Sequence, residues 1–233
     1  MSYIYETHMH TNVGSRCSRV SPEDQIRRLH HYGYTGAFIT EHFLNGNTAV
    51  PKDLPWEEAI DRFMLSYEMA KAEGDRLGLD VFFGFECSYQ GNDVLTYGLG
   101  REWLKAHPEM MEMSMRQYCE FARAEGGFVV HAHPFREADY IDLIRLLPRS
   151  VDAVEILNAN RSDFQNERAA EYARNYELPI TAGSDLHIPQ CRLAGVSSPV
   201  RFTSDMDYCN AVRNREISPV VVFDGRVSKT LCD

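Results

Sequence analysis

The chain has 233 residues and a formal net charge of −10, from 24 Lys and Arg residues against 34 Asp and Glu residues. A chain of this length can bury a large core as one α/β unit, so we expect a single domain over residues 1–233. The acidic balance, without a block rich in Lys or Arg, argues against extended nucleic-acid binding. It leaves room for a small phosphorylated substrate.

Targeting and cysteine patterns favour the cytoplasm. The apolar runs are too short to span a membrane, and no basic segment followed by an apolar stretch opens the sequence. The six cysteines lack CxxC spacing, which suits a reducing compartment better than a disulfide framework. We therefore predict a cytoplasmic protein, and the sequence leaves its oligomeric state open.

Helix-like and strand-like segments alternate along the chain. Ser21 can cap a helix that has Pro22 in its first position and ends at Gly33, and residues 56–77 carry apolar side chains at helical spacing. Further helices are predicted over 114–125, 140–147, 163–176 and 206–214. The predicted strands are 3–7, 36–40, 81–86, 94–98, 128–131, 151–157, 179–182, 200–202 and 220–223.

The first seven of these strands alternate with helices or loops, which predicts a parallel sheet, open or closed. Parallel α/β folds place their sites at the carboxyl ends of the strands. Histidines and carboxylates stand at this end of five strands, so we expect them to converge. The clusters are His8-Met9-His10, Glu41-His42, Glu86, His131-Ala132-His133-Pro134 and Asp185-Leu186-His187.

Imidazole and carboxylate groups gathered in this way are typical ligands of divalent metal ions. Neutral imidazole suits Zn, Mn and Fe, and the two oxygens of Glu86 or Asp185 could bridge neighbouring ions. Such ions can polarise a phosphoryl oxygen and lower the pKa of a bound water from about 15.7 towards 7, which gives a metal-bound hydroxide as nucleophile. The clusters therefore predict a site for several metals that needs no side-chain nucleophile.

Some of these residue types have simpler explanations. A single histidine at a strand end is more often a hydrogen-bonded boundary residue, and His30 and His31 fit the end of a helix. His131 can face away from the cluster if its strand alternates, with His133 as the ligand. Isolated cysteines such as Cys17 are more often small buried apolar groups.

The type and order of the motifs resemble the PHP (polymerase and histidinol phosphatase) superfamily. Its pattern HxH, (D/E)H, GxE, HP and SDxH is matched within residues 3–190. The resemblance implies an α/β fold of the distorted (β/α)7 barrel type, with two or three divalent metal ions (Mn, Zn or Fe) as cofactors, and hydrolysis of phosphoesters. Carried over by position, the metal ligands would be His8, His10, His42, Glu86, His133, Asp185 and His187.

Two positions depart from the family pattern. Where many members have His or Asp after HxH, the stretch from Asn12 to Cys17 offers only Cys17 as a ligand. Where a further histidine is common after GxE, this chain has Asp93, which we predict as an additional metal ligand. The choice between two and three metals stays open.

Substrate contacts are predicted beside the ligand motifs. Arg136 lies in a stretch that resembles the HPxR sequence of small-molecule phosphoesterases in this family, and its guanidinium can make paired hydrogen bonds to phosphate. Arg16 and Arg192 lie close to ligand motifs and could share this role. Asn158 lies in a stretch that resembles E-V-x-N, and it would orient the substrate or a metal-bound water.

We predict a metal-dependent phosphoesterase that hydrolyses a small phosphorylated metabolite or nucleotide. Arg136 would hold the phosphate, and either His187 or a metal-bound water would protonate the leaving oxygen. Three alternatives stay open: an amidohydrolase-like enzyme that cleaves C–N or ester bonds, a phosphodiesterase acting on short oligonucleotides, and a non-catalytic module.

Overall fold

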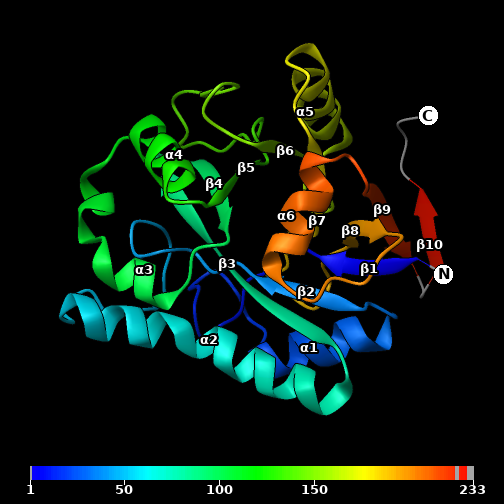
Figure 1. Cartoon of the computed structure of the whole chain (residues 1–233), viewed down its shortest axis with the longest axis horizontal. Coiled ribbons are helices and arrows are strands. Elements are labelled where there is room, and N and C mark those ends of the chain that lie inside the picture. Colours follow the sequence, from blue (N-terminus) through cyan, green and yellow to red (C-terminus); the bar gives the residue numbers. More distant parts are fainter. Residues whose placement is uncertain (1, 224–225, 230–233) are drawn as a thin grey trace.

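The computed structural model describes residues 2–223 and 226–229, which form a mixed α/β fold around one sheet (Figure 1). The described strands lie in the order β10-β9-β8-β1-β2-β3-β4-β5-β6-β7. Their bounds are β1 (Tyr3–Glu6), β2 (Gly36–Ile39), β3 (Asp80–Tyr89), β4 (Asn92–Tyr97), β5 (Phe128–Ala132), β6 (Ala153–Asn158), β7 (Ile180–Gly183), β8 (Leu193–Ser198), β9 (Ser218–Phe223) and β10 (Arg226–Lys229).

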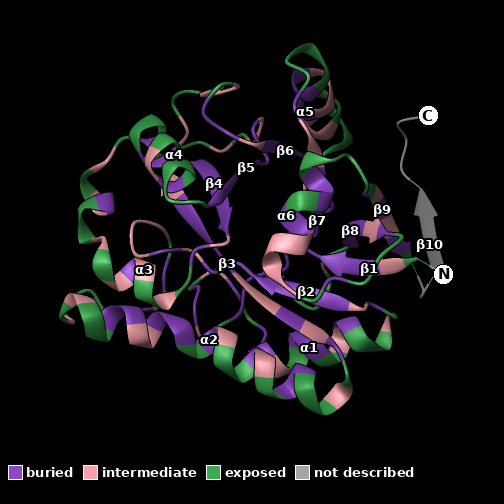
Figure 2. Cartoon of the chain, in the orientation of Figure 1, coloured by how far each residue is buried: buried purple, intermediate pink, exposed green. Residues whose placement is uncertain are grey.

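Several helices begin at serine caps that the sequence supplies. The side chains of Ser21, Ser114 and Ser162 each accept a hydrogen bond from the backbone N–H three residues on. Helix α2 packs on α1 and β3, α4 packs on β5, and α5 packs on β6, with their buried faces turned to the sheet (Figure 2). The helices are α1 (Pro22–His31), α2 (Trp56–Leu77), α3 (Arg101–Ala106), the 3₁₀ helix η1 (Pro108–Glu112), α4 (Met115–Ala124), α5 (Asp163–Asn175) and α6 (Asp205–Arg213).

Helix α6 packs against one core with residues from strands all along the sheet. The Tyr208 ring lies 4.7 Å from that of Phe38 in β2 and 5.0 Å from that of Tyr97 in β4, between ring centroids. The Tyr208 hydroxyl also hydrogen-bonds with Thr181 in β7, at 2.8 Å. Because strands far apart in the sheet order share this core, the sheet must curve around it.

The curved sheet nearly closes on itself where β7 approaches β1. Thr7 Oγ1 donates a 2.7 Å hydrogen bond to the Ala182 carbonyl, and Ser184 N donates one of 2.9 Å to Glu6 Oε1. A parallel bridge joins Met9 and Leu186 just beyond the two strands. The prediction of an α/β fold is confirmed in the form of a nearly closed, barrel-like sheet.

The regular parallel repeat expected of a (β/α)7 barrel is interrupted at β4. Strands β1, β2 and β3 pair in parallel, as do β5, β6 and β7, but β4 is antiparallel to both of its neighbours. The cause is a tight hairpin: Gln90 and Gly91 both have positive φ, 56° and 82°, as a two-residue hairpin turn requires. Strand β3 therefore continues to Tyr89 instead of ending at Glu86.

The predicted helix over 140–147 is wrong. Residues 141–147 are in neither a helix nor a strand, because the side chain of Asn92 binds their backbone. Asn92 Nδ2 donates to the Leu143 carbonyl at 2.9 Å, and its Oδ1 accepts from Arg145 N at 2.7 Å. These bonds hold the segment against the β3–β4 hairpin and replace the bonds of a helical turn.

The predicted strand over 200–202 is also wrong, since the strand in this region is β8, which ends at Ser198. The Ser198 hydroxyl accepts from Val200 N and donates to the Val200 carbonyl, which turns the chain just after the strand. Within the described residues, no helix is both long and apolar enough to cross a membrane. The five cysteines described there are free, and Cys232 lies outside the described residues.

Candidate metal centre

The side chains predicted as metal ligands gather at one end of the barrel-like sheet. They come from different strands, which bring distant parts of the sequence together, and most are fully buried. His8 and His10 follow β1, His42 follows β2, Glu86 lies in β3, His133 follows β5, and Asp185 and His187 follow β7.

Glu86 lies at the centre of this cluster. Its Oε1 is 3.4 Å from His8 Nε2 and 3.3 Å from His133 Nε2. Its Oε2 is 2.6 Å from His42 Nδ1 and 3.5 Å from His10 Nε2. Although Glu86 is fully buried, neither of its oxygens accepts a hydrogen bond. A buried carboxylate without hydrogen bonds is costly to desolvate, so a cation between these atoms explains the arrangement.

Asp185 forms the second carboxylate of the cluster. Its Oδ1 lies 3.6 Å from His8 Nε2, 3.4 Å from His10 Nε2 and 3.3 Å from His187 Nδ1. The donors fall into three groups whose ligand atoms lie within 4.8 Å of one another, and neighbouring groups share a histidine. The groups are His8 with Glu86 and His133, His8 with His10 and Asp185, and His10 with His42 and His187. Imidazole and carboxylate donors of this kind fit divalent metal ions.

Two of these side chains stand on strained backbone. His133 has φ 27° and Asp185 has φ 57°, in the left-handed region that residues other than glycine rarely adopt. Neighbouring contacts hold both: His133 N donates to Glu155 Oε2 at 3.0 Å, and Asp185 N donates to the His8 carbonyl at 2.8 Å. Strain of this kind typically persists where a site fixes the direction of a side chain.

The close packing of opposite charges shifts the pKa values of the cluster. Burial alone raises the pKa of Glu86, but the facing imidazoles of His42 and His8 hold it well below its usual value. Burial lowers the pKa of His8, but Glu155, Asp185 and Glu86 raise it well above its usual value. These directions favour the ionised form of Glu86, which attracts positive charge.

Residues behind the cluster orient its histidines. His8 Nδ1 bonds with Glu155 Oε1 at 2.9 Å, which leaves Nε2 to face the other donors. His10 Nδ1 lies 3.2 Å from Ser15 Oγ, and that hydroxyl donates to Glu41 Oε2 at 2.5 Å. Glu155 and Glu41 are therefore positioning residues that act through a histidine.

Glu155→Gln is expected to weaken metal affinity about 10–100-fold while the chain stays folded, because a partner that fixes a ligating imidazole contributes on that scale. The measurement is titration of chelator-stripped protein with Zn²⁺ or Mn²⁺. Glu167→Gln, at an exposed position of α5, is the matched control and should bind as the unmodified chain does. Equal affinities for the two variants would contradict the positioning role.

The two remaining predicted contacts on the β4–β5 side lie next to the cluster. Asp93 in β4 is buried, with its Oδ2 3.9 Å from His133 Nε2 and 3.4 Å from Arg136 Nη1. The Arg136 guanidinium also lies over the ring of Tyr140, 5.4 Å from its centroid. Arg136, Asp93 and His133 line a cavity of about 470 Å³ that opens from the cluster.

The other predicted substrate residues lie elsewhere. Asn158 is fully buried, and its Nδ2 donates to Glu155 Oε2 at 3.0 Å and approaches Asp185 Oδ2 at 3.4 Å, so it touches the carboxylates instead of lining the cavity. Arg16 and Arg192 are exposed and do not line the cavity either. Arg192 donates to the Arg161 carbonyl, at 3.1 Å.

Sequence reasoning missed Arg161 as a residue of the site. It lines the same cavity as Arg136, and its Nη2 donates to Asp185 Oδ2 at 2.8 Å. Its Nε is buried and has no hydrogen-bond partner. Its position in the sequence could have identified it: Arg161 lies three residues after Asn158, just past the end of β6. Side chains at this end of the strands reach the site in parallel α/β folds.

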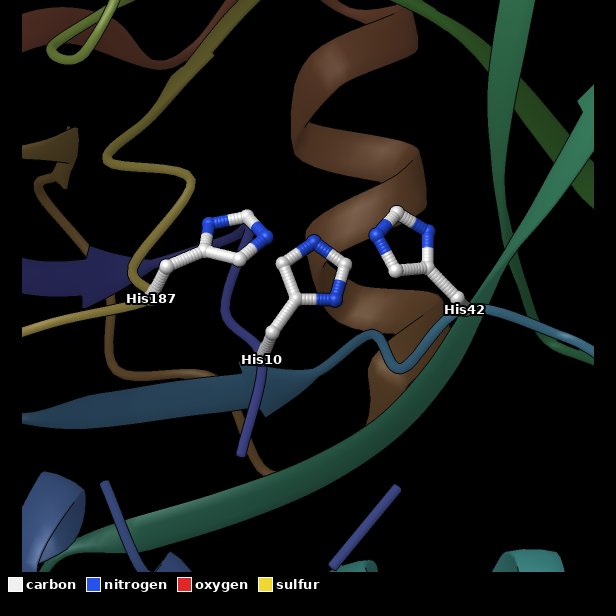
Figure 3. Close-up of side chains that lie close together, drawn as sticks. All are labelled: His10, His42 and His187. Atoms are coloured by element: carbon white, nitrogen blue, oxygen red, sulfur yellow. The ribbon is translucent and has the colours of Figure 1, made fainter. Parts of the chain in front are cut away.

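Three imidazole rings and a thiol form the more open side of the centre. Figure 3 shows the ring of His10 between those of His42 and His187, at centroid distances of 4.3 and 4.4 Å. Cys17 lines the cavity beside them. Burial raises the pKa of the Cys17 thiol, but His187 and His42 lower it to about 6.

Comparison with known protein families matches one segment of the sequence. A family model described as PHP-associated matches residues 163–191, which include Asp185 and His187. No curated protein matches the sequence significantly. Solved structures provide the remaining matches, at low sequence identity.

Three of these structures cover most of this chain. A two-domain protein from Bacteroides vulgatus that contains a predicted PHP-like metal-dependent phosphoesterase is 14% identical, with a TM-score of 0.71 over 94% of this chain and 64% of that one. A candidate metal-dependent phosphoesterase from Bifidobacterium adolescentis is 15% identical, with a TM-score of 0.54 over 91% and 96%. An amidohydrolase from Chromobacterium violaceum, solved with bound sulfate and no metal, is 15% identical, with a TM-score of 0.58 over 89% and 96%.

This chain therefore spans less than two thirds of the Bacteroides protein, and at these identities the likeness of structure concerns the fold. The matched segment and the five motifs in their order resemble the PHP superfamily, and the solved structures share the fold of this chain.

Proposed function

We propose that the protein hydrolyses phosphomonoesters of small metabolites with the help of two or three divalent metal ions. The observation that carries this proposal is Glu86, a buried carboxylate without hydrogen bonds whose oxygens face four imidazole nitrogens. Bound ions would supply Lewis acidity and an activated water for attack on phosphorus. His8, His10, His42, Glu86, His133, Asp185 and His187 would hold them, with Asp93 at the edge.

Two arginines support phosphate as the group that the cavity binds. Arg136 and Arg161 line the same cavity and contact different acidic residues, Asp93 and Asp185 respectively. Their planar guanidinium groups can each make paired hydrogen bonds to phosphate oxygens, and both are partly screened from water. They would orient the phosphate and offset the negative charge that develops on its oxygens.

Water in the cavity would donate the proton to the leaving oxygen. His187 Nδ1 donates to the Asp185 carbonyl at 2.8 Å, which leaves one ring nitrogen for a metal ion and none for proton transfer. His187 then serves as a ligand, and water at the open side of the cavity would supply the proton.

Arg136→Lys and Arg161→Lys are each expected to lower kcat/KM for phosphomonoesters by about 10–100-fold, because a charged bidentate contact contributes about 1.5–3 kcal/mol. Inorganic phosphate should inhibit both variants more weakly, and their metal content should stay that of the unmodified protein. The measurements are phosphate release from a panel of phosphorylated metabolites with Mn²⁺ or Zn²⁺, and metal analysis.

The matched control is Arg168→Lys, at a solvent-accessible position of α5 where the guanidinium pairs with Glu171, and its activity should not change. Turnover of amides or carboxylic esters, but not of phosphate esters, would favour the amidohydrolase alternative. The amidohydrolase from Chromobacterium violaceum, which has a similar fold, is the reason to test it. Preference for short oligonucleotides over monoesters would favour a phosphodiesterase.

A further inference from the structure

A second cavity lies beside the one that opens from the metal ligands. Its volume is about 560 Å³, and it shares three lining residues with the first cavity: Asn45, Ser88 and Gln90. Ser88 lies in β3, and Gln90 lies in the turn between β3 and β4. The two cavities therefore adjoin along the end of this hairpin.

The boundary between the two cavities is exposed at Gln90 and fixed at Ser88. Gln90 is open to solvent, so no packed core separates the cavities at that residue. Asn45 holds both backbone groups of Ser88: its Nδ2 donates to the Ser88 carbonyl at 3.1 Å, and its Oδ1 accepts from Ser88 N at 3.2 Å. A ligand that crosses the boundary at Gln90 therefore displaces an exposed side chain and leaves the strand in place.

Methionine side chains are prominent among the residues that line the second cavity. Met111, Met113 and Met115 come from the end of η1 and the start of α4, and Leu147 adds a fourth apolar side chain. Met111, Met113 and Leu147 are only partly buried, although they pack against the core. Thioether side chains adapt to irregular shapes and make favourable contacts with aromatic rings. The cavity therefore offers an adaptable apolar surface next to the cavity that contains the metal ligands.

The polar side chains of the second cavity have partners of their own. Arg116 Nε donates to Glu120 Oε1 at 2.8 Å, and Arg145 Nη2 donates to Gln90 Oε1 at 2.9 Å. Ser114 is the cap of α4, where its side chain is engaged in the capping box. Apolar contacts are thus the main ones left for a ligand in this cavity.

We propose that the second cavity binds the leaving group of the substrate and that this leaving group has an aromatic, apolar body. The inference rests on the proposed function, because it takes the phosphate of the ester to lie in the first cavity beside Arg136 and Arg161. The alcohol part then extends over Gln90 to Met111 and Met113. Compact polar esters such as glycerol 1-phosphate leave the methionine contacts unmade and bind more weakly.

Phosphonates test this proposal without turnover, because their C–P bond is not hydrolysed by a phosphatase. The chain loaded with Mn²⁺ is titrated with 1-naphthylmethylphosphonate and with methylphosphonate in a calorimeter. The unmodified chain should bind the naphthyl compound about 10–100-fold more tightly, from the apolar area that is removed from water. Met113→Gln keeps the length of the side chain but makes its end polar, so it should lose most of this preference and bind methylphosphonate as before.

Met69→Gln is the matched control, because Met69 is exposed on α2 and lines neither cavity. Its affinities for both phosphonates should equal those of the unmodified chain. Met111→Gln is an independent second variant with the same expectation as Met113→Gln. Equal affinities of the unmodified chain for the two phosphonates, or a naphthyl preference that survives in both cavity variants, would overturn the proposal.

Phosphate release separates this inference from the proposed function. Hydrolysis of 1-naphthyl phosphate and glycerol 1-phosphate with equal kcat/KM would overturn the inference and leave the proposed function intact. Preferential binding of the naphthyl phosphonate that depends on Met113, without phosphate release from either ester, would support the second cavity as the site of the apolar group and refute the phosphatase assignment.

Discussion

Replacement of Glu86 by glutamine is expected to remove most of the bound metal and to lower phosphatase kcat/KM by about 10³-fold or more. Its two oxygens together face four imidazole nitrogens from three different segments of the chain. Glutamine lacks the negative charge of Glu86, and its amide nitrogen cannot bind a cation. The ions that share this residue would therefore lose a common ligand. Metal content by plasma mass spectrometry and phosphate release with excess Mn²⁺ measure the effect.

Glu57→Gln provides the comparison for this variant. Glu57 is exposed in the first turn of α2, so the same chemical change there should leave both metal content and turnover as they are. If Glu86→Gln retained its ions and its turnover, the assignment of Glu86 as the shared ligand would be wrong, and with it the main support for the proposed function.

Gly183→Ala is expected to displace His8 and so to lower both stability and metal binding. A Cβ atom at residue 183 would lie 2.5 Å from His8 Cβ and 3.0 Å from Glu155 Oε1, closer than packed atoms come. The loss in the free energy of unfolding should be about 1–3 kcal/mol, as for other overpacked cores. Urea unfolding of the metal-free protein measures the stability, and Zn²⁺ titration measures the affinity.

Gly100→Ala is the matched control for this change. Gly100 precedes α3, its φ is −108°, and a Cβ atom there would meet nothing within 4 Å. The expected change in unfolding free energy is less than about 1 kcal/mol, with metal affinity unchanged. An equally small effect at Gly183 would mean that β7 and the His8 segment can separate without harm to the centre.

The convergence of the ligands could be predicted from the sequence, because the end of a strand is a local feature. Buried runs end at His8, His42 and Asp185, and parallel strands bring such ends to one edge of the sheet. The alternation along β5 likewise places His131 away from the site, with its ring edge-on to Tyr172, 5.9 Å between centroids. These predictions depended only on the strand period and on the common direction of the strands.

Contacts between loops could not be predicted in this way. Arg161 enters the site because the chain turns just after β6, whereas Arg16 is exposed and lies outside the cavity lining, although both are arginines close to ligand motifs. The helix expected over 140–147 is absent because Asn92, some fifty residues earlier, binds its backbone. Propensity within a segment carries no information about such distant partners.

The packing of α6 inside the curved sheet bears on how substrate enters the site and how product leaves it. Tyr208 and the rings of Phe38 and Tyr97 pack against one another in the interior of the curved sheet. A reactant that enters through the cavity lined by Arg136 and Arg161 shares this opening with the fragments that leave through it. The released phosphate and the arriving ester would compete for that opening, so turnover should slow as product accumulates.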